Sequence, residues 1–157
     1  MKSLILILLC LAFVSCYDHK QNVQSNYIHA KKNNLEWSGI TEIQLSKETD
    51  TLTIFGISNT PDDEVIVMKI KFEGPGEYHL THNQAYYYRT IGGDVLISKY
   101  NIAPKTIGKI KILDYNEKDQ VVEGYFQISL RKEWSNPTND IEILDFENGF
   151  FSGKISH

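Results

Sequence analysis

Cysteine is scarce in this chain and is confined to one end of it. Only Cys10 and Cys16 occur among the 157 residues. No disulfide can therefore join distant parts of the chain, and the fold must be stable through its hydrophobic core alone. A chain of about 150 residues is long enough for this, because it buries roughly 68–70% of its unfolded surface as one domain.

Basic residues and long apolar runs are also in short supply. Lys and Arg number 16 against 20 Asp and Glu, which gives a formal net charge of −4. This sign argues against a nucleic-acid partner, which requires a basic surface. The one long apolar run, Leu4 to Val14, is shorter than the roughly 20 residues of a membrane-spanning helix.

That apolar run has the layout of an export signal. Lys2 precedes it, and Ser15 follows it as the small residue before the cleavage point at Cys16. The leader resembles a bacterial lipoprotein signal, with Phe13 where Leu is preferred, so ordinary signal-peptide cleavage is the alternative. The resemblance implies removal of residues 1–15 and a diacylglycerol thioether on Cys16. Two or three acyl chains would make this membrane anchor effectively permanent.

The segment that follows is polar and has no sustained periodicity. Residues 16–33 are mostly Asn, Gln, Lys, Ser and His, with few apolar side chains among them. This composition predicts a flexible tether between the lipidated cysteine and the folded part. We therefore expect a single β domain over residues 34–157.

Within that domain the dominant hydrophobic period is two, which is typical of half-buried strands. The clearest example is the set Val122, Gly124, Phe126, Ile128 and Leu130, which alternates with mostly polar residues. Similar runs recur along the chain, separated by turn residues. The pattern predicts an all-β fold of about nine or ten short strands, either an antiparallel β-sandwich or a flattened β-barrel.

The strongest local turn motif is Asn148-Gly149, between two apolar runs at 141–146 and 150–155. Asn-Gly readily adopts the positive φ angles of a two-residue type I′ turn. The motif therefore predicts a terminal β-hairpin.

Four segments follow one another in a familiar order: Gly76-Glu77-Tyr78-His79-Leu80, Gly108-Lys109-Ile110-Lys111-Ile112-Leu113-Asp114, Val122-Glu123-Gly124-Tyr125-Phe126 and Asn148-Gly149-Phe150-Phe151. This series resembles a group of small Bacteroidetes lipoproteins of uncharacterised function. Tyr125 departs from the small residue usual at its position. The resemblance implies an all-β envelope lipoprotein in a Gram-negative host, with no catalytic residues to transfer.

Residues capable of metal or acid–base chemistry are present but poorly arranged. Three-residue spacing along a strand sends His79 and His82 to opposite faces, and no cysteine is nearby to complete a zinc site. The acidic segments 62–64 and 114–119 are typical of solvated turns rather than calcium loops. No Gly-x-Ser-x-Gly motif occurs. We therefore expect no catalytic residues, no metal, no cofactor and no enzymatic activity.

The best candidates for ligand binding are tyrosines. Tyr86 and Tyr88 fall on one face of a predicted strand and Tyr87 on the other, with Tyr100 close in sequence. An exposed pair of rings would offer stacking area with hydroxyl groups. The alternative is that these tyrosines merely pack against the sheet, as Tyr often does in β proteins.

These features lead to one main functional hypothesis and two alternatives. The main one is a monomeric, lipid-anchored binding module of the outer membrane, facing the periplasm or the cell surface, that holds a glycan, peptide or protein through Tyr86, Tyr88 and Tyr100. The first alternative is a structural or inhibitory lipoprotein with an acidic protein-binding face. That face would consist of Asp62, Asp63, Glu64, Glu117 and Asp119. The second, less favoured, is a small hydrolase.

Overall fold

The structure, a computed structural model, describes residues 26–58, 60, 62–103, 106, 108–137 and 140–156. The predicted leader and its lipidation residue, Cys16, lie outside these ranges. In the part that is described, no helix is long and apolar enough to cross a membrane.

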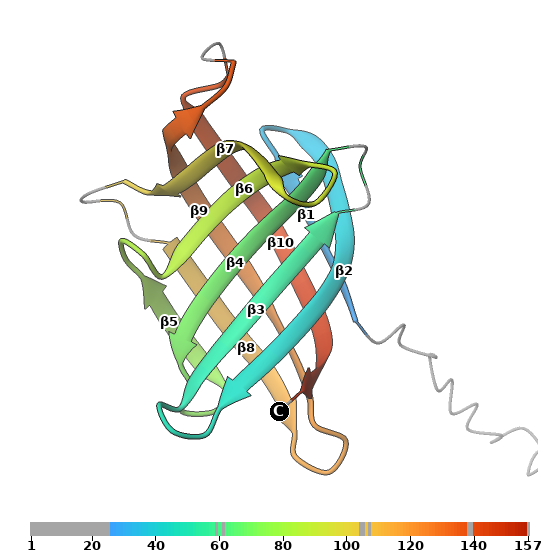
Figure 1. Cartoon of the computed structure of the whole chain (residues 1–157). Helices are drawn as coiled ribbons and strands as arrows, with labels where there is room; N and C mark the ends of the chain where they lie inside the picture. The colour runs from blue at the N-terminus through green and yellow to red at the C-terminus, as the bar shows by residue number, and fades with distance from the viewer. Residues whose placement is uncertain are drawn as a thin grey trace, which may run out of the picture.

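The described chain forms ten strands and no helix, so the predicted all-β fold is confirmed (Figure 1). The strands are β1 (Tyr27–Lys32), β2 (Leu35–Ser46), β3 (Thr51–Ser58), β4 (Asp63–Lys71), β5 (Gly76–Leu80), β6 (Ala85–Ile91), β7 (Val95–Ile102), β8 (Gly108–Asn116), β9 (Val121–Ser135) and β10 (Ile143–Ser156).

All ten strands belong to one sheet, and the pairings of that sheet close on themselves to give a ring. Starting from β2, the ring runs through β3, β4, β6, β7, β9 and β10, and returns to β2 both directly and through β1. Strands β8 and β5 continue the sheet from the N-terminal half of β9, whose C-terminal half pairs with β7. A single ring-like sheet thus replaces the two separate sheets of the sandwich alternative.

One pairing is parallel, although the sequence pattern suggested antiparallel strands throughout. Strand β1 is antiparallel to both β2 and β10, so these two flanking strands run in the same direction. Where β1 begins at Tyr27, they meet directly, with Ile155 opposite Ile43. The parallel contact is therefore a geometric consequence of a short strand placed between two longer ones.

The predicted tether boundary at residue 33 was wrong, because β1 lies inside that segment. Ile28 and Ala30 are almost completely buried, while Tyr27 and His29 face outward. Only two apolar residues point inward, too few to form a recognisable period in a polar segment. The strand is nevertheless held on both edges, by β2 and β10.

The interior of the ring is filled by the residues that the period-two pattern selected. Phe126, Ile128 and Leu130 of β9 and Ile66 and Met68 of β4 are all buried there. The inward alternation predicted along these strands is therefore confirmed.

The predicted terminal hairpin at Asn148-Gly149 was wrong. The first run from Ile143 onward and the whole second run belong to the single strand β10, which pairs with β9 on either side of the motif. Phe146 lies opposite Ile128 and Gly149 opposite Phe126, so β10 carries one extra residue, a β-bulge. Asn148 takes the positive φ of 51° that the motif suggested, but in a bulge instead of a turn.

Candidate functional site

A row of side chains crosses the outer face of the ring in direct register over five strands. His29 of β1 lies opposite Phe150 of β10, Phe150 opposite Tyr125 of β9, Tyr125 opposite Lys111 of β8, and Lys111 opposite Glu77 of β5. All five side chains are exposed or half-buried. We call this set the outer row.

The rings of the outer row touch one another and extend to Tyr27 of β1. The ring centroid of Phe150 lies 5.2 Å from that of Tyr125, 5.8 Å from His29 and 5.6 Å from Tyr27. These separations are typical of favourable aromatic pairs. Tyr125 is 51% exposed, so the aromatic part of the row ends in an accessible side chain.

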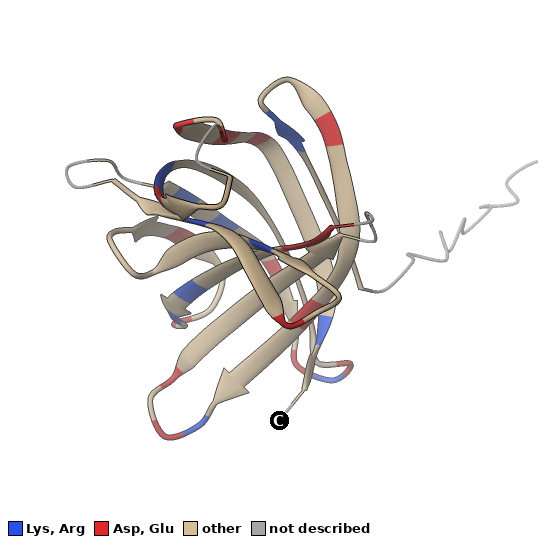
Figure 2. Ribbon diagram, turned by 45° about the horizontal axis from the view of Figure 1, so that its top comes forward, with Lys and Arg blue, Asp and Glu red and all other residues tan. Residues whose placement is uncertain are grey.

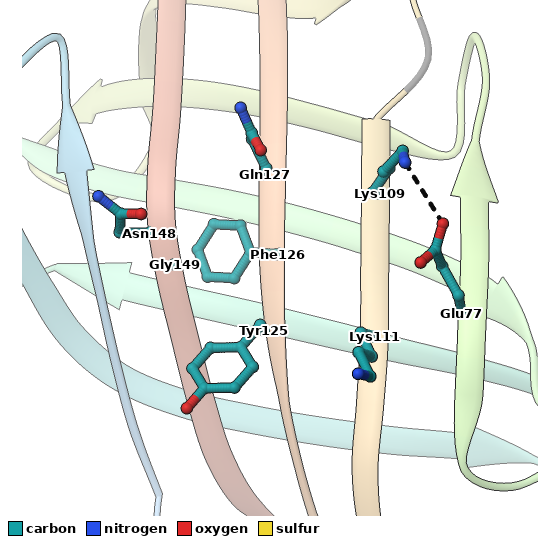
Figure 3. Close-up of a pocket in the computed structure, with 8 residues that line it drawn as sticks. All are labelled: Glu77, Lys109, Lys111, Tyr125, Phe126, Gln127, Asn148 and Gly149. Atoms are coloured by element: carbon teal, nitrogen blue, oxygen red, sulfur yellow. Dashed lines mark ion pairs between the residues drawn. The ribbon is translucent and has the colours of Figure 1, made fainter.

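A groove of about 250 Å³ lies beside Tyr125 (Figure 3). Its lining combines one ring that faces solvent with amide and charged groups. The lining residues are Glu77, Lys109, Lys111, Tyr125, Phe126, Gln127, Asn148 and Gly149. An apolar surface with a few convergent polar groups is the usual composition of a small-ligand site.

The β-bulge shapes this groove. It turns Glu147 and Asn148 outward in succession and restores the inward direction at Gly149. Gly149 has no side chain, and a Cβ there would lie 2.4 Å from the Phe126 ring. The floor of the groove is therefore a glycine backbone packed on a buried ring, a feature that the sequence showed only as a turn motif.

The two lysines of the groove differ in their partners. Lys109 Nζ lies 3.4 Å from Glu77 Oε1. Lys111, two residues further along β8, makes no hydrogen bond or ion pair within the described residues. The groove lining therefore contains one cation that is not neutralised by a neighbour.

The two histidines considered as metal ligands are not brought together. His79 is exposed and its Nε2 lies 4.0 Å from Glu77, whereas His82 Nδ1 lies 3.1 Å from the carbonyl oxygen of Ile102. Among the residues that the structure describes, no group of three His, Cys, Asp or Glu side chains could hold a metal ion.

The three tyrosines proposed as ligand residues do not share a face. Tyr86 and Tyr88 are half-buried on the outer face of β6, with ring centroids 6.4 Å apart and an interplanar angle of 23°. Tyr100 is only 2% exposed and lies inside the ring-shaped sheet. It donates a hydrogen bond to the carbonyl oxygen of Ile141 at 2.9 Å. Burial raises the pKa of Tyr100, and the charge of Asp140 raises it further.

Tyr86 and Tyr88 belong to a second outer patch, which we call the Tyr86 patch. Val67 lies opposite Tyr86, and Val65 lies opposite Tyr88. Phe55 and Ile57 of β3 continue these two rows on the other side of β4. Both valines are buried although they face outward, because the neighbouring rings and aliphatic side chains cover them.

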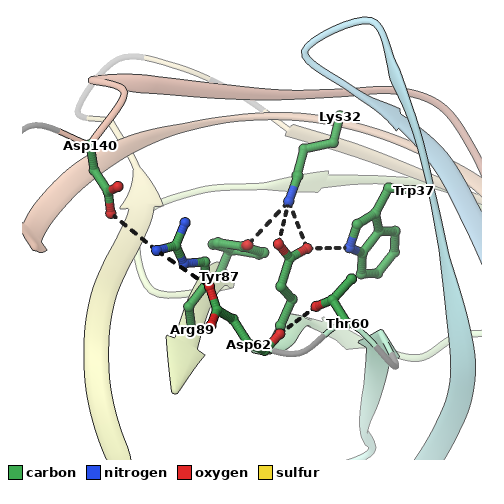
Figure 4. Close-up of polar contacts among 8 residues, drawn as sticks. Lys32, Trp37, Thr60, Asp62, Tyr87, Arg89 and Asp140 are labelled. Carbon is green, nitrogen blue, oxygen red and sulfur yellow. Dashed lines mark hydrogen bonds and ion pairs between the residues drawn. The ribbon is translucent and has the colours of Figure 1, made fainter. Parts of the chain in front are cut away.

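A buried polar cluster lies inside the ring near one end (Figure 4). Glu64 accepts hydrogen bonds from Lys32 Nζ at 2.6 and 2.7 Å and from Trp37 Nε1 at 2.7 Å. Lys32 Nζ also donates to the Tyr87 hydroxyl at 3.3 Å. Burial raises the pKa of Tyr87, and the negative charge of Glu64 raises it further, so Tyr87 stays neutral. We call these four residues the Glu64 cluster.

Arg89 extends this cluster toward the mouth of the ring. Its guanidinium lies 3.9 Å from both Asp62 and Asp140 (Figure 4). Sequence reasoning missed the whole arrangement, because it placed Glu64 in a charged turn. The parity of the strand could have revealed it, since Glu64 points the same way as Ile66 and Met68.

The acidic face considered in the alternative hypothesis is divided by the fold. Glu64 is 8% exposed and points into the ring, whereas Glu117 and Asp119 lie in the β8–β9 turn at the opposite end from the β3–β4 connection (Figure 1). Acidic and basic residues are interspersed over the strands and loops (Figure 2).

Comparison with known proteins identifies a family but no characterised relative. No curated protein and no solved structure matches the chain. Residues 24–153 match the model of a domain of unknown function, DUF6252, from just before β1 into the last strand. Since this match covers most of the chain, the protein belongs to the DUF6252 family.

Proposed function

We propose that this protein is a lipid-anchored, non-enzymatic binding module of the cell envelope, and that it holds a glycan on the outer row. The observation that carries the proposal is the alignment of His29, Phe150 and Tyr125 in one register, ending beside a groove with polar walls. We therefore propose Tyr125 as the centre of the binding surface, in place of the predicted Tyr86, Tyr88 and Tyr100.

The chemistry of the outer row suits a sugar chain. A pyranose ring has a face of C–H groups and a rim of hydroxyls, so it stacks on an aromatic ring while its hydroxyls need polar partners. Tyr125 and Phe150 supply the aromatic surface, and Gln127 and Asn148 supply amide donors and acceptors. The row crosses several strands of a closed sheet, so its rings are ordered before a ligand arrives and little conformational entropy is lost on binding.

The anchor is proposed from the leader, with Cys16 as the lipidated residue. Ten residues separate Cys16 from Tyr27. Fully extended, this stretch reaches at most about 40 Å, so the anchored domain would stay close to the bilayer. A Cys16→Ala variant should fail to incorporate radiolabelled palmitate and should leave the membrane fraction, and continued detergent partitioning of that variant would contradict the anchor.

A second candidate function is supported by the Tyr86 patch. Its half-buried rings beside buried Val65 and Val67 would suit an apolar surface of a protein partner. This candidate places the partner on β3, β4 and β6, away from the groove.

The two surfaces can be separated by matched variants of the mature, full-length protein. We expect immobilised oligosaccharides to retain the wild-type protein and the Tyr86→Ala variant, but not the Tyr125→Ala variant. Both tyrosines are outward-facing, so each variant controls for the loss of a ring from the surface. Loss of binding with Tyr86→Ala alone would move the site to the Tyr86 patch, and failure to retain any oligosaccharide would overturn the glycan proposal.

A further inference from the structure

We infer that the saccharide bound in this groove is anionic, an inference that rests on the proposed function and specifies its ligand. The feature that carries it is Lys111, which lies in register between the Tyr125 ring and Glu77. A ligand stacked on Tyr125 would place its rim next to this ammonium group (Figure 3).

The charge of the groove is opposite to that of the protein. The chain as a whole has a formal net charge of −4. The groove lining holds two lysines and one glutamate, and that glutamate is paired with Lys109. A local positive excess in a negative protein attracts an anionic ligand to this place and repels it elsewhere, which favours one binding position.

The remaining lining groups fit an acidic sugar better than a simple anion. Lys111 supplies a point charge for a carboxylate or a sulfate. Gln127 and Asn148 can bind hydroxyls, and Tyr125 can stack on the ring that carries them. A free inorganic anion would use only the lysine, so the set as a whole is matched to a uronic acid or a sulfated sugar.

The inference can be tested on the mature, full-length protein with three probes of similar length. These are oligogalacturonate, which carries carboxylates, chondroitin sulfate, which also carries sulfates, and a neutral galactan oligomer. We expect the acidic probes to bind about five- to tenfold more tightly than the neutral one, as befits a partly screened contact between charges. The preference should shrink as salt is raised. The difference between the two acidic probes tells whether carboxylate or sulfate is the preferred group.

Three lysine variants make the test specific. Lys111→Gln should remove the preference for acidic probes, and Lys111→Arg should retain it. Lys154→Gln, an exposed lysine of β10 outside the groove lining, should leave binding unchanged. Both substituted side chains, Lys111 and Lys154, are on the surface, and equal denaturation midpoints for the three variants would show that the fold is intact.

The outcomes separate this inference from the proposal beneath it. Equal binding of neutral and acidic probes, with Lys111→Gln silent, would overturn the anionic ligand and leave glycan binding in place. Absence of binding by all three probes would overturn both. A preference lost equally with Lys154→Gln would mean that general charge attraction, and not the groove, is responsible.

Discussion

The Glu64 cluster and the outer row use similar residues for different ends. Each sets a lysine beside an aromatic ring and a glutamate. Inside the ring-shaped sheet, Lys32 Nζ lies 2.6 Å from Glu64, which also accepts a hydrogen bond from Trp37 Nε1. Outside, Lys111 has Tyr125 and Glu77 as neighbours in register but no polar contact within the described residues.

Burial explains why the two regions differ. An unpaired charge in the interior is costly, because desolvation is not offset by another partner, so every charge of the Glu64 cluster has to be matched. On the surface, water solvates an unpaired ammonium and salt screens it, so Lys111 can remain unpaired at little cost. The charges of the interior arrangement therefore have to be paired, whereas the outer lysine stays free to contact the proposed ligand.

Strand β1 takes part in both regions, and its removal should have the largest effect. It contributes Lys32 to the Glu64 cluster, His29 to the outer row, and buried Ile28 to the core. A chain that begins at residue 34 also loses pairing with two strands. Since domains of this kind are stable by only about 5–15 kcal/mol, we expect no cooperative thermal transition from that chain.

The matched chain, which begins at residue 26, should melt cooperatively with a β-type circular dichroism spectrum. Equal melting curves for the two chains would mean that β1 contributes nothing to stability, and the tether boundary at residue 33 would be restored.

The next largest effect is expected from Glu64→Ala. The substitution leaves the Lys32 ammonium and the Trp37 N–H without their acceptor in a mostly buried place. Removing one partner of a buried pair typically costs about 3–5 kcal/mol. Lys111→Ala, the counterpart in the outer row, should change stability by less than about 0.5 kcal/mol. Urea denaturation of both variants measures the contrast, and similar losses would erase the distinction between the two regions.

The Glu64 cluster also shows where sequence reasoning reached its limit. Alternation correctly selected the inward residues of β4 and β9, because period two reports which face is buried. It did not select Lys32 and Glu64, since charged residues at strand ends are usually solvated. Their pairing joins residues 32 positions apart, and only the closure of the sheet brings them together.

The outer row was missed for a related reason. Each member is an ordinary surface residue of its own strand, and the row exists only through the register of five strands. Tyr86 and Tyr88, by contrast, are two residues apart in one strand, so their common face could be predicted from local spacing. Tyr100 was grouped with them by closeness in sequence, although it points into the ring.

A smaller loss of stability is expected at Gly149, where interior and groove meet. In the bulge, any Cβ collides with the Phe126 ring, so Gly149→Val and Gly149→Asn should both be destabilising, by about 1–3 kcal/mol. In a type I′ hairpin turn, Asn would be tolerated and only Val would be harmful. Chemical denaturation of the two variants distinguishes these cases, with Gln127→Ala as a control on the outer wall of the groove. A mild Asn variant would argue against the close packing of Gly149 on Phe126.

The smallest effect concerns an ion pair whose burial is intermediate between that of the Glu64 cluster and that of the outer row. Lys99 Nζ lies 2.9 Å from Glu133 Oε2, and their side chains are 45% and 36% exposed. The hydrogen bond from Lys99 lowers the pKa of Glu133, and the one from Asn101 adds to this effect. A carboxyl with a lowered pKa in the folded state stabilises the protein above the pKa of the unfolded chain, near 4.3, and this contribution is lost as pH falls through the folded value. Because solvent screens the pair, the contribution should stay below about 1 kcal/mol. Urea midpoints measured from pH 7 down to pH 3 should therefore fall slightly less in Glu133→Gln than in the wild type. Parallel plots of midpoint against pH would show that the pair contributes nothing measurable, like an unpaired surface charge and unlike the Glu64 cluster.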